Sequence, residues 1–180
     1  SVHIPPNSKT YSYELEDIYD RLDLLFQQTY DPHYNLSSII NYIYESWPIK
    51  DNSGENVRTW TDLFEFRDYP QEIITHKSTL LHFLGTVQRF RKSSMFIDHR
   101  VTSIYLAKEI KRINSGDIFV IDIATISALE EQAFIVGDVM KTIDEMYSER
   151  YYSSINDNKD KKPKYIFIFI DEINRFLPKS

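Results

Sequence analysis

Apolar residues recur every three or four positions through the first two thirds of the chain, which is the spacing of one face of an α-helix. Acidic residues near the start of the first stripe suit the positive end of a helix dipole. Pro32 and Pro48 end the first two stripes, because proline cannot continue a helix. A shorter helix or turn is predicted around Trp60. The pattern predicts helices over residues 12–31, 35–47, 78–90 and 102–113.

The last third of the chain has a different pattern. Residues 118–123 and 165–170 are short runs rich in β-branched and aromatic types, and they predict strands buried on both faces. Residues 127–153 carry a helical stripe that begins at a predicted capping box of Ser127 and Glu130. The polar residues 156–164 predict a mobile loop. Strand, helix and strand form a βαβ unit, for which we expect parallel strands and a right-handed crossover.

Carboxylates stand at the ends of both predicted strands. Asp171 and Glu172 directly follow residues 165–170, and Asp122 lies near the end of residues 118–123. Ligands of open α/β sheets bind at the carboxyl ends of the strands. Such acids either serve a ligand site or cap the following turn, since apolar runs that end in acids are common. For Asp122 the two readings are contact with the site and a role as a cap or turn former.

Composition limits the class of protein. The chain has 180 residues, of which 42% are hydrophobic and 27% charged, as in a globular domain with its own core. Cysteine is absent, which excludes disulfides and thiolate metal sites. No apolar run has the length of a membrane span, so we expect no membrane contact and a cytoplasmic location.

Charge is balanced toward the acidic side. The formal net charge of −6 argues against a broad phosphate-binding face. A local group of basic residues is best explained as a solvated helix surface, with a DNA or subunit contact as the alternative. This group comprises Arg89, Arg91, Lys92, His99, Arg100, Lys108, Lys111 and Arg112.

Four segments together resemble the HerA/FtsK-type DNA translocase ATPases, in particular the HerA type. They are residues 10–13 (TYSY), 116–124 (GDIFVIDIA), 131–137 (EQAFIVG) and 169–178 (FIDEINRFLP). The resemblance is strongest over residues 116–178. It implies an α/β fold with part of a RecA-like P-loop NTPase core, made of parallel strands with a long crossover helix, over residues 116–180. It also implies a mainly helical insertion region over residues 1–115.

The same resemblance implies an activity and its residues. Residues 165–172 match the Walker B strand, in which Asp171 would bind the cofactor by holding Mg²⁺ through water. Glu172 would be the catalytic residue that positions the water attacking ATP. Asn174 and Arg175 would couple nucleotide state to a neighbouring subunit, unless they serve surface or capping roles. The implied function is that of a hexameric, ATP-driven DNA translocase or helicase that processes DNA ends, with DNA in the ring and a NurA-like nuclease as partners.

One motif of that family is missing. Walker A requires G-x-x-x-x-G-K-[ST], and none of the four glycines precedes a Lys-Ser or Lys-Thr pair. Lys77-Ser78 lacks the glycines whose backbone N–H groups hold phosphate. We therefore expect the chain to be a part of a longer protein and to be inactive toward ATP by itself.

Two other hypotheses remain open at this point. One is a non-catalytic interaction module whose helical half docks a partner protein. The other is a metal-dependent phosphohydrolase that uses Asp171, Glu172 and Asp122, for which no further ligand stands at a suitable spacing. A strand followed by Walker A in the coding sequence before Ser1 would favour the translocase.

Overall fold

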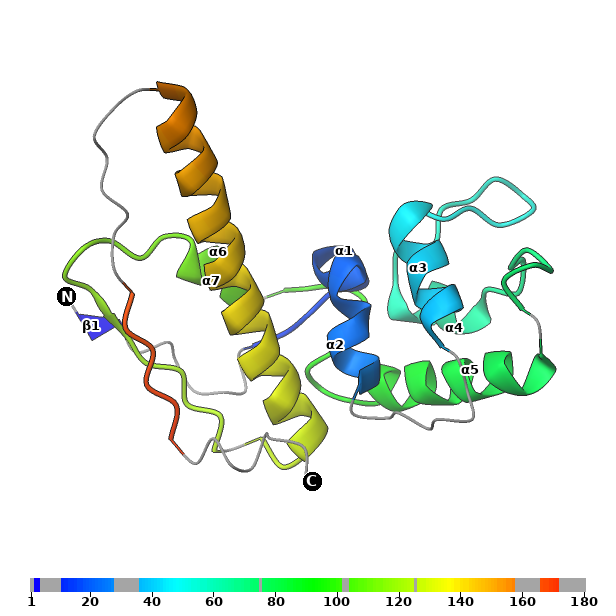
Figure 1. The fold of residues 1–180 in the computed structure, drawn as a ribbon. Coiled ribbons are helices and arrows are strands. Elements are labelled where there is room, and N and C mark those ends of the chain that lie inside the picture. The colour runs from blue at the N-terminus through cyan, green and yellow to red at the C-terminus, as the bar shows by residue number, and fades with distance from the viewer. Residues whose placement is uncertain are drawn as a thin grey trace, which may run out of the picture. The chain divides into compact units, whose positions relative to one another are not determined.

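The computed structural model describes residues 2–3, 11–27, 36–74, 76–101, 104–124, 126–157 and 166–171, with backbone only for 2–3, 27 and 150–157. The chain forms two compact units (Figure 1). The helical unit is Lys9–Tyr105. The split unit combines Ser1–Ser8 with Leu106–Ser180, so the helical unit lies between its two parts in sequence.

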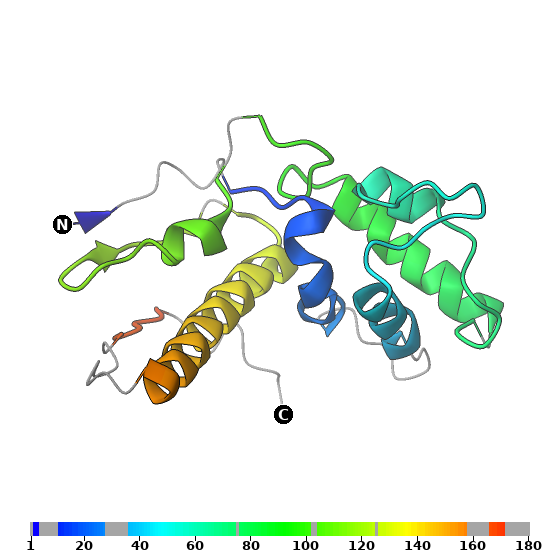
Figure 2. The ribbon, with the colours of Figure 1, turned by 90° about the horizontal axis from the view of Figure 1, so that it is seen from above.

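In its described residues, the helical unit begins with three short consecutive helical segments and continues with three separate helices. The first three are α1 (Leu15–Ile18), the 3₁₀ helix η2 (Tyr19–Arg21) and α2 (Leu22–Gln27). The others are α3 (Ser37–Glu45), α4 (Trp60–Glu65) and α5 (Lys77–Arg91). α4 packs against α5, and the two run side by side in both ribbon views (Figures 1 and 2).

Aromatic rings fill the core of the helical unit. Phe83 and Phe90 lie on the buried face of α5. The Phe83 ring stacks on Phe26 with centroids 4.9 Å apart, and the Phe90 ring meets Phe96 at 5.1 Å. Phe96 also lies 5.3 Å from the ring of Trp60, which is fully buried. Such offset and edge-to-face pairs stabilise a core beyond the area that they bury, by about 1 kcal/mol each.

The first and last segments of the helical unit lie side by side. Tyr11 pairs with Ile104 and Tyr13 with Phe96 in isolated parallel bridges. The Ser12 N–H donates to the Ile104 carbonyl over 3.1 Å. The backbone of Tyr13 donates to Met95 over 2.8 Å and accepts from Ile97 over 3.1 Å. Backbone hydrogen bonds therefore join the segment through which the chain enters the helical unit to the segment through which it leaves.

The split unit is built around one long helix. α7 (Leu129–Asp157) packs against α6 (Leu106–Ile110). β1 (Val2–His3) pairs in parallel with β2 (Ile118–Phe119), with Val2 opposite Ile118. Gln132 on α7 is buried, and its side-chain amide donates to the backbone carbonyls of Ile123 and Ile126. That contact fixes the turn before the helix.

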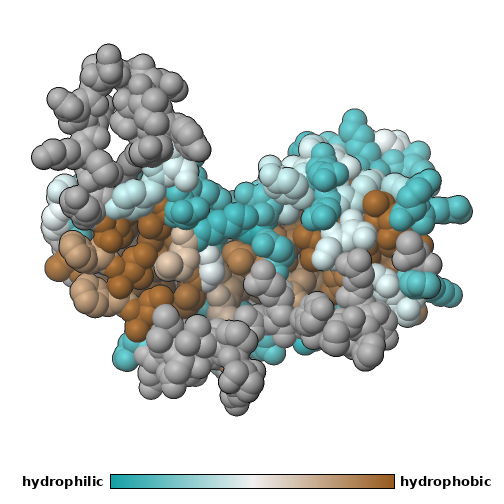
Figure 3. Space-filling view, viewed as in Figure 1, coloured by the Kyte–Doolittle hydropathy of each residue, from teal (hydrophilic) through white to brown (hydrophobic). Residues whose placement is uncertain are grey.

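The predicted RecA-like sheet is wrong. The structure is mostly helical, and the sheet among the described residues is one parallel pair of two-residue strands. Only Ile118–Phe119 of the predicted strand 118–123 forms a ladder, and residues 166–170 are described without one. The side chains of Phe167 and Phe169 are 82% and 92% exposed. Figure 3 shows apolar atoms gathered over this part of the split unit.

The physical reason lies in what a short apolar run can specify. Such a run indicates that burial would be favourable, but a strand also needs neighbours that pair its N–H and C=O groups. Those neighbours come from distant sequence, and here they are supplied to Ile118–Phe119 alone among the described runs. The predicted βαβ unit is therefore not formed within the part of the chain that the structure describes.

The predicted helices are placed more accurately, with changes at their ends. The stripe over residues 12–31 is interrupted by η2, where the Tyr19 ring stacks on Trp47 at 4.6 Å. α7 begins at Leu129. Instead of the predicted capping box of Ser127 and Glu130, hydrogen bonds from the Gln132 side chain hold the segment before the helix. Residues 28–35 and 158–164 lie outside the described residues. The predicted division of the chain into a helical insertion region, residues 1–115, and part of an ATPase core, residues 116–180, stays a prediction.

Candidate functional site

The predicted Walker B acids are only partly described. Asp171 is exposed and follows residues 166–170, whereas Glu172, Asn174 and Arg175 lie outside the described residues. The exposed Asp122 accepts a 2.9 Å hydrogen bond from the Ala124 N–H, which is the turn-forming role weighed for it. The roles of Asp171 and Glu172 toward Mg²⁺ and ATP stay predictions, as do the DNA, nuclease and hexamer contacts.

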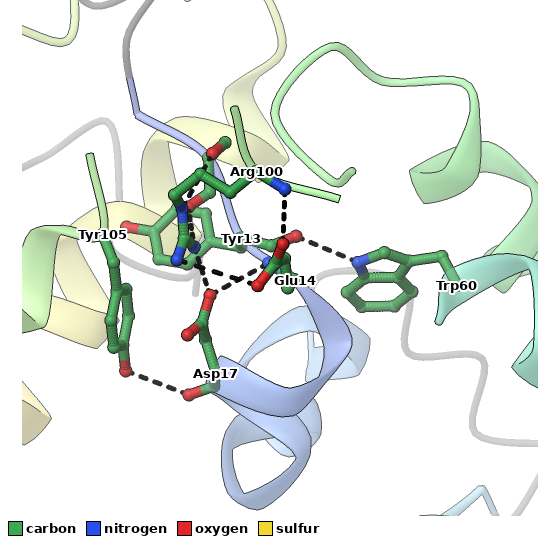
Figure 4. Close-up of polar contacts among 7 residues, drawn as sticks. Tyr13, Glu14, Asp17, Trp60, Arg100 and Tyr105 are labelled. Atoms are coloured by element: carbon green, nitrogen blue, oxygen red, sulfur yellow. Dashed lines mark hydrogen bonds and ion pairs between the residues drawn. The ribbon is translucent and has the colours of Figure 1, made fainter. Parts of the chain in front are cut away.

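Arg100, predicted on a solvated surface, is instead the centre of a polar network (Figure 4). Its guanidinium pairs with Asp17, lies 3.8 Å from Glu14 and donates to the Ser12 carbonyl over 2.8 Å. The side chain is 21% exposed. The Tyr105 ring lies 5.5 Å from the guanidinium, and its hydroxyl donates to the Asp17 carbonyl over 2.9 Å. These contacts join the two ends of the helical unit, so we assign Arg100 a structural role.

A capping box starts α4. The Thr59 hydroxyl accepts from the Asp62 N–H over 3.0 Å, and the Asp62 carboxylate accepts from the N–H groups of Thr59 and Arg58. Burial by itself would raise the pKa of the Asp62 carboxyl. The hydrogen bonds from Thr59 and Arg58, together with the charge of His99, outweigh burial and bring that pKa below its usual value. The folded state therefore favours the ionised form of the Asp62 carboxyl.

Two arginines lie over one aromatic ring at the other end of α4. Phe64 is half-buried, and its ring centroid lies 5.9 Å from the Arg67 guanidinium and 5.4 Å from that of Arg91. Both arginine side chains are exposed. A guanidinium over an aromatic face is attracted by the ring quadrupole, by about 0.5–1 kcal/mol at exposed sites. Phe64, Arg67 and Arg91 together are called the Phe64 surface below.

Hydrogen bonds hold each of these arginines in place. Arg67 Nη1 donates to the carbonyls of Phe64 and Phe66 over 2.6 and 2.7 Å. Arg91 Nε donates to the Thr61 hydroxyl over 3.1 Å. Among the described residues, no carboxylate forms an ion pair with Arg67 or Arg91.

Thr61, which accepts the hydrogen bond from Arg91, is itself held in place by Asp98. The Thr61 N–H and hydroxyl both donate to the Asp98 carboxylate, over 3.1 and 2.5 Å. Because the hydroxyl proton points to Asp98, the oxygen lone pairs are left to accept from Arg91. The orientation of Arg91 is therefore determined by a chain of hydrogen bonds that runs back into the fold.

A pocket of about 250 Å³ lies beside the Phe64 surface. Carboxylates line it, but several already bind backbone N–H groups: Asp51 accepts from Ser53 and Glu55, and Asp68 accepts from Asn52. These acids hold the loop of residues 50–56 in place. The pocket lining comprises Asp51, Glu55, Asn56, Val57, Asp62, Glu65, Phe66, Arg67 and Asp68.

Comparison with known proteins gives no functional assignment. No family model matches the chain, and no curated protein or solved structure is similar to it. The described part of the chain has no group of three or more His, Asp or Glu side chains arranged to hold a metal ion. None of its described helices combines the length and the apolar composition needed to cross a bilayer.

Sequence reasoning missed the Phe64 surface. It placed Phe64 in a short helix or turn, gave Arg67 no role and grouped Arg91 with a basic helix surface. The spacing of Phe64 and Arg67, three positions apart near a helix end, is the local signal that was present. Arg91 comes from another helix, and only the packing of α4 on α5 brings it to the ring.

Proposed function

We propose that the helical unit is a docking module that binds a partner protein through the Phe64 surface. The single observation that carries this proposal is the pair of exposed guanidiniums held over the half-buried Phe64 ring. Arginine and aromatic residues, phenylalanine included, are enriched at the cores of protein interfaces, and arginine is among the residues that most often dominate the binding energy. A surface of this composition suits recognition better than a uniformly hydrated helix face.

Rigidity supports the same proposal. Ordering a flexible arginine on binding costs about 0.5–1.5 kcal/mol, which weakens an interface built from mobile side chains. Here the hydrogen bonds of Arg67 to backbone carbonyls at the end of α4, and of Arg91 to Thr61, have already restricted both side chains. Much of that cost is therefore met during folding, and more of the contact energy remains for the partner.

The arrangement of the unit in the chain is also suitable for a module. Lys9–Tyr105 has its own core, and its entering and leaving segments pair with each other. Domains with adjacent ends are readily inserted into a host chain, because they leave the path of the host nearly unchanged. The Phe64 surface is then part of a helical unit that has its own core.

Peptide selection tests the proposal. A random peptide library displayed on phage is selected against the full chain, and each enriched peptide is measured for affinity by fluorescence anisotropy. We expect peptides that bind the full chain and lose at least tenfold in affinity with the Phe64→Ala variant, a loss typical of a central interface residue. Thermal unfolding confirms that the variant is folded.

The matched control is Glu72→Ala, which removes an exposed side chain outside both the Phe64 surface and the adjoining pocket. We expect this variant to bind the selected peptides within about twofold of the unchanged chain. Peptides that bind the Phe64→Ala variant as tightly as the unchanged chain, or a library with no binder, would overturn the proposal.

A further inference from the structure

We infer that the Phe64 surface binds a carboxylate side chain of the partner, so that the docked segment is a peptide that presents an Asp or a Glu to the two arginines. This inference rests on the proposed docking function and adds the chemistry of the partner. It follows from the donors that remain on the two arginines, from their spacing around one ring and from the charges nearby.

Each guanidinium retains a pair of parallel donors. Arg67 uses Nη1 for backbone carbonyls, which leaves its Nε and Nη2 groups. Arg91 uses Nε for Thr61, which leaves Nη1 and Nη2. Among the described residues, no acceptor is bonded to these remaining groups. Two parallel N–H donors match the two oxygens of a carboxylate, and such charge-assisted pairs are about twice as strong as neutral hydrogen bonds.

The Phe64 ring gives the bound segment a second contact. The ring is half-buried and holds both guanidiniums within 6 Å of its centroid, at 5.4 and 5.9 Å. An acidic side chain bound by either fork would bring its own methylene groups near this aromatic edge. Burial of those groups contributes about 0.8 kcal/mol for each CH₂. The site therefore fits Asp or Glu in a polypeptide better than a small free anion.

Nearby charges favour a discrete carboxylate over a nucleic acid. Glu65 is exposed on the same helix, and Asp62 and Asp68 line the adjoining pocket together with Arg67. A phosphate backbone places a negative charge at every nucleotide, so it would meet these carboxylates as well as the arginines. The net charge of −6 adds a general repulsion of polyanions. A peptide can place one acid at the arginines and other residues beside Glu65.

The test uses the peptides selected against the full chain, each remade with glutamine or asparagine in place of its Glu and Asp residues. We expect the acidic form to bind at least tenfold more tightly than its amide counterpart. Arg91→Gln should reduce affinity for the acidic form by about tenfold, and Arg91→Lys should also reduce it, because lysine keeps the charge but lacks the fork. Thermal unfolding checks that both variants are folded.

Arg89→Gln is the matched control, since it removes the same charge from an exposed position on α5 without a contact to Phe64. Equal losses in the Arg89 and Arg91 variants would indicate general charge attraction and overturn the inference. Selected peptides that bind through Phe64 but tolerate loss of their acids would overturn it while the docking function stands. Tighter binding of single-stranded oligothymidine than of any peptide, abolished by Arg91→Gln, would also overturn it.

Discussion

The indole N–H of Trp60 donates to the backbone carbonyl of Tyr13 over 3.0 Å, across 47 positions of sequence. Figure 4 shows this hydrogen bond. Both residues are fully buried, so water cannot replace the bond when the donor is lost. It ties the start of α4 to the first segment of the helical unit.

Replacement of Trp60 by Phe should therefore lower the free energy of unfolding. The change removes one of the two donors to the buried Tyr13 carbonyl, which keeps the hydrogen bond from the Ile97 N–H, and it removes part of the ring contact with Phe96. Loss of a hydrogen bond of this kind costs about 0.5–1.5 kcal/mol. Urea unfolding followed by far-UV circular dichroism measures the loss. Trp47→Phe, which changes a half-buried indole, is the control. Equal stability of the Trp60 variant and the unchanged chain would contradict this assignment.

Arg100→Met should destabilise the helical unit by about 2–3 kcal/mol, because it removes charged hydrogen bonds and leaves the partly buried Asp17 and Glu14 without their cation. The control is Arg58→Met, since Arg58 lies 3.9 Å from Glu16 with both side chains more than half exposed. An exposed pair of this kind contributes about 0–1 kcal/mol. Urea midpoints of the two variants decide the matter, and similar shifts would argue against a structural role for Arg100.

Tyr69→Phe should leave stability unchanged or raise it by up to about 1 kcal/mol. Tyr69 is 8% exposed, and its hydroxyl has no hydrogen-bond partner among the described residues. Removal of an unsatisfied buried hydroxyl relieves a desolvation cost. Tyr44→Phe at an exposed position is the control for thermal unfolding.

The same residue predicts a pH dependence. Burial raises the pKa of the Tyr69 phenol above its usual value, so the folded state keeps the proton longer than the unfolded state does. This contribution is fully present below the unfolded pKa of about 10 and is lost as pH rises above it. Stability of the unchanged chain should therefore fall more steeply in alkali than that of Tyr69→Phe. If the free energies of unfolding of the two proteins ran parallel over the alkaline range, burial would not hinder the ionisation of Tyr69.

Asp62→Asn, at the third position of α4, should cost about 1 kcal/mol at pH 7, the usual scale for loss of capping hydrogen bonds at a helix N-terminus. The lowered pKa of Asp62 means that its contribution is present above the unfolded pKa of about 3.9 and is lost as pH falls through the folded value. The stabilities of the variant and the unchanged chain should converge in acid. Glu65→Gln on the same helix removes a charge without backbone hydrogen bonds and serves as the control. A constant difference across the acid range would exclude the ionised cap.

Local patterns predicted the helices of this protein better than its distant contacts. The stripe over residues 78–90 became Lys77–Arg91, because a repeat of apolar residues specifies both the helix and its buried face. The run 166–170 failed as a buried strand, since its ladder would depend on partners elsewhere in the chain. Arg100 was misplaced for a similar reason. Its acidic partners stand 83 and 86 positions earlier, and no local periodicity marks such a pairing.

The paired ends of the helical unit also constrain the order of its folding. The contact between Arg100 and the Ser12 carbonyl spans 88 positions, and closing a flexible loop of that length costs about 4 kcal/mol beyond the length-independent part. Helices that pack locally, such as α4 on α5, incur far less of this entropy. We therefore expect the seam that joins residues 11–13 to residues 95–101 and to Ile104 to form late. By the same reasoning its amide protons should exchange through partial opening, before those of α5 exchange through global unfolding.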